Sequence, residues 1–299
     1  MSGQAVLAGQ GWRVGRYLDG LLRFCRHEPL GTLGLLVILL MLGAGILAPF
    51  IAPYDPLATD YVALAAPPSF QHLAGTDTFG RDILSRLVYG ARTALIIGLA
   101  SSFLGSTAGF VLGTASAYFG GRVDAVIQGV IGVVLSIPLI VMALVVIAVL
   151  GHAELFGVDF NLVLAIATPM VGLVARVIRN AALSVRTMPY VDAARAAGYG
   201  HMRIVLRHMA PNLFAPYVIL LSSYVAQAIL LEAALSFLGL GVTEPTPSWG
   251  LMLAGTTVSF FRTAPWTLLC PGLAITAAVF AFSMFGDALR DWLDPRMKV

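Results

Sequence analysis

Charge is scarce in this chain. Only 11% of its 299 residues are Asp, Glu, Lys or Arg, while 59% are hydrophobic and the mean hydropathy is +0.88. Soluble domains carry about 25% charged residues, so a large soluble core does not explain this composition. The chain is therefore predicted to be an integral membrane protein. Its apolar runs reach the roughly 20 residues that cross a bilayer and lack a period of two, which favours helices.

Cysteine and lysine are also rare. The two cysteines, Cys25 and Cys270, precede the first apolar run and lie inside the last, so we expect neither a disulfide nor a metal site. The only lysine is Lys298, so the chain has no GxxxxGK[ST] phosphate loop. Neither GxSxG nor HExxH occurs. We expect no enzyme activity, cofactor or metal on this chain, and its scattered arginines do not predict nucleic-acid binding.

Six apolar runs are long enough to span a membrane, and the expected fold is all-α. The first run exceeds a signal-peptide core and ends without a convincing cleavage site, so we expect it to be retained. The predicted spans cover residues 30–53, 93–118, 123–150, 161–182, 213–238 and 266–288.

The basic residues predict the orientation. With the N-terminus inside, fourteen of the 18 lysines and arginines fall on the inner side. The outer side then holds only Arg81, Arg86, Arg92 and Arg262. Because positive charge accumulates in cytoplasmic loops, both termini and the loop 183–212 are expected in the cytoplasm.

A stripe of small residues runs along the second predicted span. Gly105, Gly109, Gly113 and Ala117 recur at every fourth position. Such a stripe allows the backbone of another helix to approach closely. Packing within the helix bundle is the expected role, with ligand contact as the alternative.

A polar segment, Tyr190–Asn212, interrupts the apolar sequence between the fourth and fifth spans. Its alanine-rich stretch Asp192–Ala197 favours a short helix, with Asp192 near the positive end of the helix dipole. Gly198 or Gly200 can close that helix with a left-handed residue. A smooth alanine surface can enter a groove on another protein, although an ordinary linker would have similar composition.

Here the sequence resembles a known family. Asp192-Ala193-Ala194, Gly198 and Pro211 are similar to the EAA loop of bacterial ABC importer permeases, with Asp192 in place of Glu. His208 and Ala210 depart from the second half of that motif. In the family this loop forms a coupling helix that sits in a cleft of the ATPase subunit. The resemblance implies such a contact for Tyr190, Asp192, Ala193, Ala194, Ala197 and Gly198.

The resemblance extends over most of the chain. The segments 75–92, 232–250 and 286–296 are similar to the C-type permease of dipeptide, oligopeptide and nickel importers. Gly132 departs from the family, many members of which carry Asp there. The implied divisions are an N-terminal segment 1–29, a first helix with its periplasmic loop 30–91, and a core 92–288. That core carries the EAA loop near 189–211, and a cytoplasmic tail 289–299 follows.

A type I ABC importer permease fold in the bacterial inner membrane is what this resemblance implies. The implied partners are a homologous B-type permease, two cytoplasmic ATPase subunits that bind ATP and magnesium, and an extracytoplasmic binding protein. Cargo would be di- or oligopeptides, with nickel or another small solute as the alternative. A secondary transporter or channel that needs no ATPase is the distant alternative, but it predicts internal repeats, which are not evident.

Two further sets of residues have open roles. Glu232 is the one carboxylate placed well inside a span, where it needs a partner or water. It either lines the translocation path or makes a structural hydrogen bond. Before the second span, an interfacial helix would pair Arg81 with Ser85 and Asp82 with Arg86. With Asp77 and Gly80, these residues either meet the binding protein or form a solvated helix on the bilayer.

Overall fold

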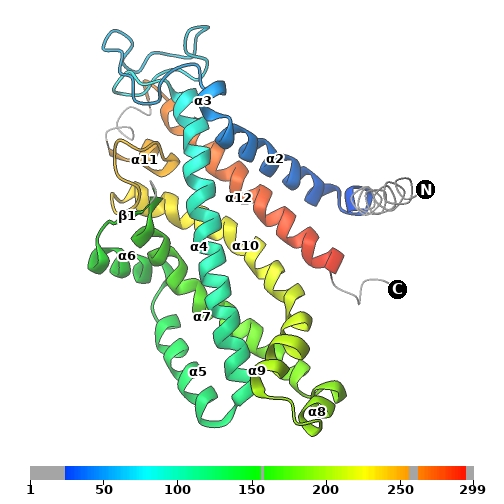
Figure 1. The fold of residues 1–299 in the computed structure, drawn as a ribbon. Coiled ribbons are helices and arrows are strands. Elements are labelled where there is room, and N and C mark those ends of the chain that lie inside the picture. The colour runs from blue at the N-terminus through cyan, green and yellow to red at the C-terminus, as the bar shows by residue number, and fades with distance from the viewer. Residues whose placement is uncertain (1–23, 156–157, 256–261, 294–299) are drawn as a thin grey trace, which may run out of the picture.

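The chain folds into a long helical bundle (Figure 1). The computed structural model describes residues 24–155, 158–255 and 262–293. Parts of the predicted N-terminal segment and C-terminal tail lie outside these residues. The loop 52–82, α3 and α11 gather at one extremity, called here the α11 end, and α8 and α9 lie at the other, called the α8 end.

Helices account for nearly every element of the described residues. They are α2 Pro29–Ile46, α3 Ala48–Ile51, α4 Ile83–Phe119, α5 Gly121–Leu135, α6 Leu139–Leu150, α7 Phe160–Arg186, α8 Pro189–Ala196, α9 His201–Ile204, α10 Ala210–Phe237, α11 Trp249–Leu253 and α12 Trp266–Leu293. A π-helical turn, η1 Val205–Met209, joins α9 to α10. The two short strands β1 Glu154–Leu155 and β2 Val158–Asp159 pair antiparallel.

Five stretches of the described chain are helical, long and apolar enough to cross a membrane: α2, α4, α7, α12 and the continuous helix His201–Phe237. The bent pair α5 and α6 raises the number to six if it counts as one span. The prediction of a polytopic helical membrane protein is therefore confirmed, and the predicted spans differ from the helices mainly at their boundaries.

The third predicted span is not one straight helix. α5 and α6 meet at 93° across residues 136–138. Pro138 has no N–H to donate and disfavours helical geometry at Ile137 before it. The span predicted over 123–150 thus consists of two helices with a sharp bend at this proline, and it is one span only if the bent pair counts as one.

The polar segment before the fifth span is more helical than expected. The helix begins at His201 and continues through Pro211, so it starts well before residue 213, the predicted start of the span. In η1 the Ala210 N–H bonds to the carbonyl of Val205, so the turn before Pro211 contains an extra residue. Pro211, which has no N–H to donate, follows directly after this wider turn.

The glycine stripe of α4 packs against α7. A Cβ added at Gly105 would lie 2.9 Å from the Ala167 carbonyl oxygen, and one at Gly109 would lie 2.6 Å from the Val174 Cβ. Gly113 lies equally close to the backbone of α7. The packing interpretation of the stripe is confirmed, because no larger side chain fits between these backbones.

The remaining helices build on this pair. α10 contacts both α4 and α12, and α2 packs on α12 and α4. A buried apolar cluster joins α2, α4, α10, α11 and α12, and a second joins α6 and α7 to α4 and α10. A third, at the α8 end, is described below.

Replacing Gly109 with Leu is expected to destabilise the fold by about 1–3 kcal/mol, because the side chain would push α4 away from α7. Thermal unfolding of the detergent-solubilised protein measures this. Gly129→Leu is the matched control, since Gly129 is a helical glycine with no other atom within 4 Å of its added Cβ. An equal fall in unfolding temperature for both variants would contradict close packing of α4 on α7.

Candidate functional site

The short helix predicted after Tyr190 is present as α8. It begins at Pro189, with Asp192 in its first turn, and ends at Ala196. Gly198 adopts a φ of +76°, so this glycine and not Gly200 closes the helix. The Tyr199 N–H bonds to the Ala194 carbonyl at 3.1 Å, and the Gly198 N–H to the Arg195 carbonyl at 2.9 Å. These two bonds form a Schellman motif, which ends a helix sharply.

Two side chains of α8 fix it to the bundle. Val191 is 0% exposed and Ala194 is 4% exposed. Both belong to an apolar cluster with Ala117 and Tyr118 of α4, and with Ala182, Ile204, Met209 and Leu213. The Tyr118 hydroxyl also bonds to the His201 Nδ1 at 2.8 Å. α8 therefore packs on α9 and η1, in one apolar cluster with the end of α4.

The opposite face of α8 is open. Tyr190, Asp192, Ala193, Ala197 and Gly198 are all exposed. Asp192 accepts a hydrogen bond of 2.9 Å from Arg195, three residues on. The outward face thus combines exposed alanines with Tyr190 and with the ion pair of Asp192 and Arg195. Ala194, predicted with these residues to contact the ATPase, packs inward and anchors the helix, and the coupling role of the set stays a prediction.

A bidentate ion pair stiffens the same end. Arg179 of α7 donates to both carboxylate oxygens of Asp124 on α5, at 2.6 and 2.5 Å. Ser116 of α4 donates to the same carboxylate, and Arg186 donates to the Ala117 carbonyl at 2.8 Å. Three helices are joined here through one carboxylate, so α8 stands on a rigid base.

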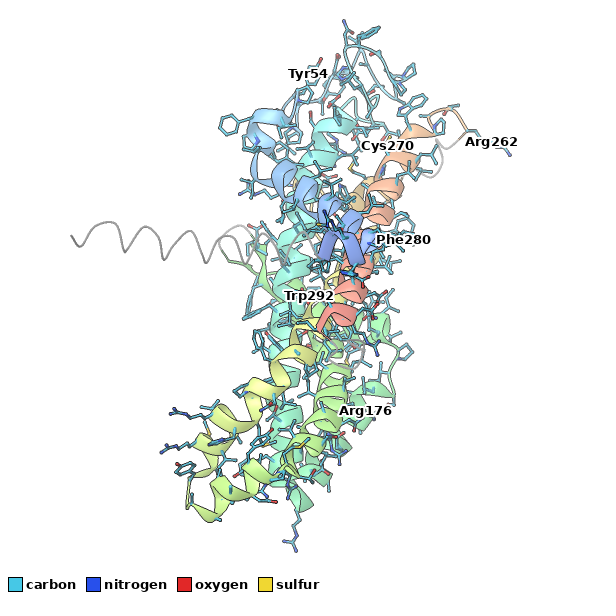
Figure 2. All side chains as sticks on the ribbon, turned by 90° about the vertical axis from the view of Figure 1, so that its right-hand side faces the viewer. Tyr54, Arg176, Arg262, Cys270, Phe280 and Trp292 are labelled. Atoms are coloured by element: carbon cyan, nitrogen blue, oxygen red, sulfur yellow. The ribbon has the colours of Figure 1, made fainter. Side chains whose placement is uncertain are left out.

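A neighbouring arginine, Arg176, makes no ion pair among the described residues and is exposed. It lies in the half of the molecule that carries α8 (Figure 2). A Cβ added at Gly132 would stand 3.8 Å from its Nη2. An Asp at position 132, as the family resemblance describes, would therefore reach Arg176.

The segment before α4 is organised differently from the predicted interfacial helix. α4 begins at Ile83, and Asp82 is its N-cap, accepting from the Ser85 N–H at 2.8 Å. The second carboxylate oxygen of Asp82 faces His72 Nδ1 at 3.0 Å. The predicted pairs of Arg81 with Ser85 and of Asp82 with Arg86 are wrong, because Asp82 is used to cap the helix.

Arg81 and Arg86 instead share two acidic partners. Arg81 pairs with Asp77 at 2.7 Å and with Glu244 at 3.2 Å. Arg86 is 1% exposed, lies 3.8 Å from both carboxylates and donates to the Pro56 carbonyl at 3.3 Å. Gly80, with φ +76°, makes the tight turn against the backbone of Asp60. These contacts join the loop 52–82 to residues 242–247.

Glu232 lies near the end of α10 and is 1% exposed. Its Oε1 accepts hydrogen bonds from the hydroxyls of Ser236 and Ser248, both at 2.8 Å. Ser236 in turn accepts from the Val242 N–H, and Ser248 caps α11. The carboxylate thus holds the chain that folds back after α10, which favours the structural alternative. A path-lining role stays a prediction.

Some of these residues could have been found from the sequence. Asp124 is the only carboxylate in the run 121–150, and Arg179 lies in the next span, so a charge pair between spans was a fair expectation. Glu244 and Ser248 carried no such signal. Their roles depend on a fold-back that brings them to partners on other elements.

The membrane-spanning bundle, with its small helix held outward at one end, defines a polytopic α-helical membrane protein. The chain belongs to the family of binding-protein-dependent transport system inner membrane components, whose family model matches residues 105–299. A second model, the N-terminal transmembrane domain of oligopeptide transport permease C, matches residues 18–68.

Curated relatives cover nearly the whole chain. The dipeptide transport system permease protein DppC of Escherichia coli is 41% identical over 273 residues, covering 89% of each chain. The di/tripeptide transport system permease protein DppC of Pseudomonas aeruginosa is 38% identical, covering 89% of this chain and 88% of its own. A putative peptide transport system permease protein of Brucella abortus is 39% identical, covering 93% and 91%.

Replacing Glu232 with Leu removes the acceptor of two buried hydroxyls and is expected to destabilise the protein by about 1–3 kcal/mol. Glu232→Gln keeps an oxygen at the same place and should unfold at nearly the wild-type temperature. Thermal unfolding in detergent compares the two. If Glu232→Gln is stable but fails in uptake, the carboxylate charge itself takes part in transport. Equal stability of both variants would contradict the hydrogen-bonding role.

Proposed function

We propose that this chain is one permease subunit of an ATP-driven importer of short peptides. It forms the membrane pathway with a homologous B-type permease. Two cytoplasmic ATPase subunits supply the energy, and an extracytoplasmic binding protein delivers the cargo. The observation that carries the proposal is α8, a short helix whose Val191 and Ala194 are buried in an apolar cluster shared with the end of α4, while its other face stays open.

In this proposal the α8 end faces the cytoplasm of a bacterial cell and both termini lie inside. The distribution of arginine supports this orientation. Arg122, Arg179, Arg186, Arg195, Arg203 and Arg207 belong to α5, α7, α8, α9 and η1. At the α11 end, Arg81 and Arg86 are paired with Asp77 and Glu244, which reduces their net positive charge.

The exposed face of α8 enters a cleft on an ATPase subunit. Its alanines lose little side-chain entropy on binding, and the exposed pair of Asp192 and Arg195 gives charges for orientation. When ATP closes the ATPase pair, α8 moves as a rigid unit with the end of α4, because both share one apolar cluster. The bundle then changes between inward-open and outward-open states.

The binding protein docks at the α11 end. The loop 52–82 exposes large apolar and aromatic side chains there, with Tyr61 at 80%, Val62 at 96% and Phe70 at 103% exposure. Aromatic residues are enriched at protein interfaces, so this loop suits a partner surface. Asp77, Gly80, Arg81, Asp82 and Arg86 hold the loop in place beneath it.

The cargo follows from the relatives. All those described above are named for peptide, dipeptide or di/tripeptide transport. A nickel or other small-solute importer would keep the same architecture. An ATPase-independent transporter would move solute in proteoliposomes that contain this chain alone, whereas the proposed importer would not.

Gly198→Val is expected to reduce co-purification of the ATPase subunits and peptide uptake severalfold. A β-branched residue at φ +76° is strained by about 1–2 kcal/mol and opens the end of α8. Pull-down and uptake by the reconstituted importer measure the effect.

Gly200→Val is the matched control, because Gly200 has φ −65° and open space around its added Cβ. It should behave as wild type. The docking role of α8 is wrong if Gly198→Val and Gly200→Val retain ATPase subunits equally.

A further inference from the structure

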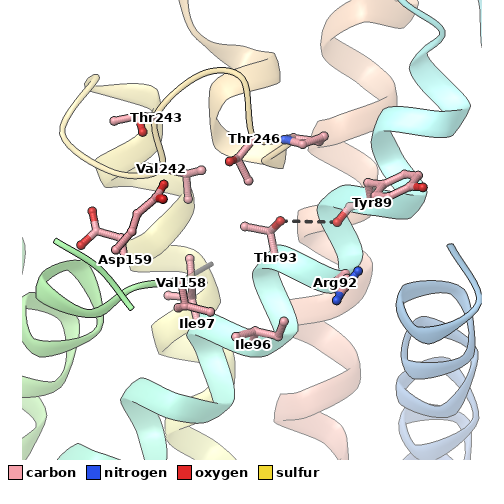
Figure 3. A pocket seen from close by; sticks show the side chains of 12 residues that line it. Tyr89, Arg92, Thr93, Ile96, Ile97, Val158, Asp159, Val242, Thr243 and Thr246 are labelled. Atoms are coloured by element: carbon pink, nitrogen blue, oxygen red, sulfur yellow. Dashed lines mark hydrogen bonds between the residues drawn. The ribbon is translucent and has the colours of Figure 1, made fainter. Parts of the chain in front are cut away.

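A cavity of about 320 Å³ opens at the α11 end (Figure 3). One wall is a single face of α4, formed by Tyr89, Arg92, Thr93, Ile96 and Ile97 at helical spacing. The other walls come from the hairpin β1–β2 and from residues 242–247. Three segments distant in sequence therefore enclose one space.

The walls combine apolar surface with a few polar groups. Ile96, Ile97, Val158 and Val242 supply apolar surface, while the threonines at 93, 243 and 246 supply hydroxyls. Sites for small molecules are apolar with a few placed polar groups and have volumes of about 300–1,000 Å³. The cavity lies at the lower end of that range, which suits a small ligand.

Opposite charges face this cavity from different elements. Arg92 comes from α4, whereas Glu154 and Asp159 come from the hairpin. Figure 3 shows Arg92 and Asp159 on opposite sides of the cavity. Asp159 is already engaged, since it caps α7 through the Leu162 N–H at 3.1 Å and pairs with His152. The side chains of Arg92 and Glu154 have no hydrogen bond or ion pair within the part of the chain that the structure describes.

Residues outside the cavity hold the wall of residues 242–247 in place. Glu232 binds Ser236, which accepts from the Val242 N–H at 3.0 Å. Glu244 is tied to Arg81, and Ser248 is tied to Glu232. Because Glu232, Glu244 and Arg81 are already bound to protein partners, the side chains of Arg92 and Glu154 are available to a ligand.

We propose that this cavity is a binding site for a short peptide with free termini. Arg92 binds the terminal carboxylate and Glu154 the terminal ammonium, while threonine hydroxyls meet the peptide amide. An extended chain spans about 3.3–3.6 Å per residue, so a cavity of about 320 Å³ suits di- and tripeptides better than longer chains. This inference rests on the proposed importer function and adds a selectivity step within the permease itself.

Binding of dialanine to the purified permease and ATPase complex, without the binding protein, tests the site. Wild type should bind dialanine and discriminate against its C-terminal amide and its N-acetyl derivative. Arg92→Gln should weaken the binding of dialanine about tenfold and abolish discrimination against the C-terminal amide. Arg92→Lys should restore part of the discrimination against the C-terminal amide. Glu154→Gln should abolish discrimination against the N-acetyl derivative instead.

Arg262→Gln is the matched control, since Arg262 is an exposed arginine that does not line the cavity. It should bind all three probes as wild type does. Thermal unfolding should be unchanged for Arg92→Gln, because this arginine makes no described ion pair. If Arg92→Gln and Glu154→Gln both discriminate against the amide and the N-acetyl derivative as wild type does, the proposed peptide site is wrong.

Measuring dialanine uptake by the complete importer distinguishes failure of the peptide site from failure of the proposed function. If the complete importer takes up dialanine with ATP while the cavity variants bind as wild type, only the site is wrong. If the complete wild-type importer takes up no peptide, the proposed function itself fails.

Discussion

The close contact between α4 and α7 is the interaction on which the rest of the structure depends. Gly105, Gly109 and Gly113 let the two backbones touch, so α4 cannot bend away from its neighbour. At 1.5 Å per residue its 37 residues form a rod of about 55 Å. One end of that rod carries the cluster that holds α8, and the other end forms a wall of the cavity. A single rigid element thus joins the proposed ATPase surface to the proposed peptide site.

Local signals in the sequence were sufficient for most of the elements. Long apolar runs predicted the membrane helices, since each run satisfies its own backbone hydrogen bonds. The alanine-rich stretch before Gly198 predicted α8, and the φ of +76° shows why a glycine closes it. The four-residue spacing of small side chains predicted a close helix contact. Each of these inferences concerns one segment and its immediate neighbours in sequence.

Local sequence signals could not predict contacts between residues that are far apart in the chain. Arg81 and Glu244 are 163 residues apart, and nothing near either residue indicates the other. Asp82 could have paired with Arg86 on a helix, but capping α4 satisfied two donors of Ser85 at once. Ala194 resembles its exposed neighbours in composition, yet the helical period turns it inward. In each case tertiary packing selected between alternatives that were locally similar.

In the proposed importer, movement of α8 reaches the cavity through α4, and the accessibility of a cysteine in the cavity wall reports this movement. Thr246→Cys would be placed in the cavity wall of a chain whose Cys25 and Cys270 are replaced by serine. In the assembled importer, ATP should change the rate at which a membrane-impermeant thiol reagent labels this cysteine. Adding Gly198→Val should reduce that change severalfold without altering the rate measured in the absence of ATP. A labelling rate that ATP does not affect, or a response that Gly198→Val does not reduce, would contradict the account.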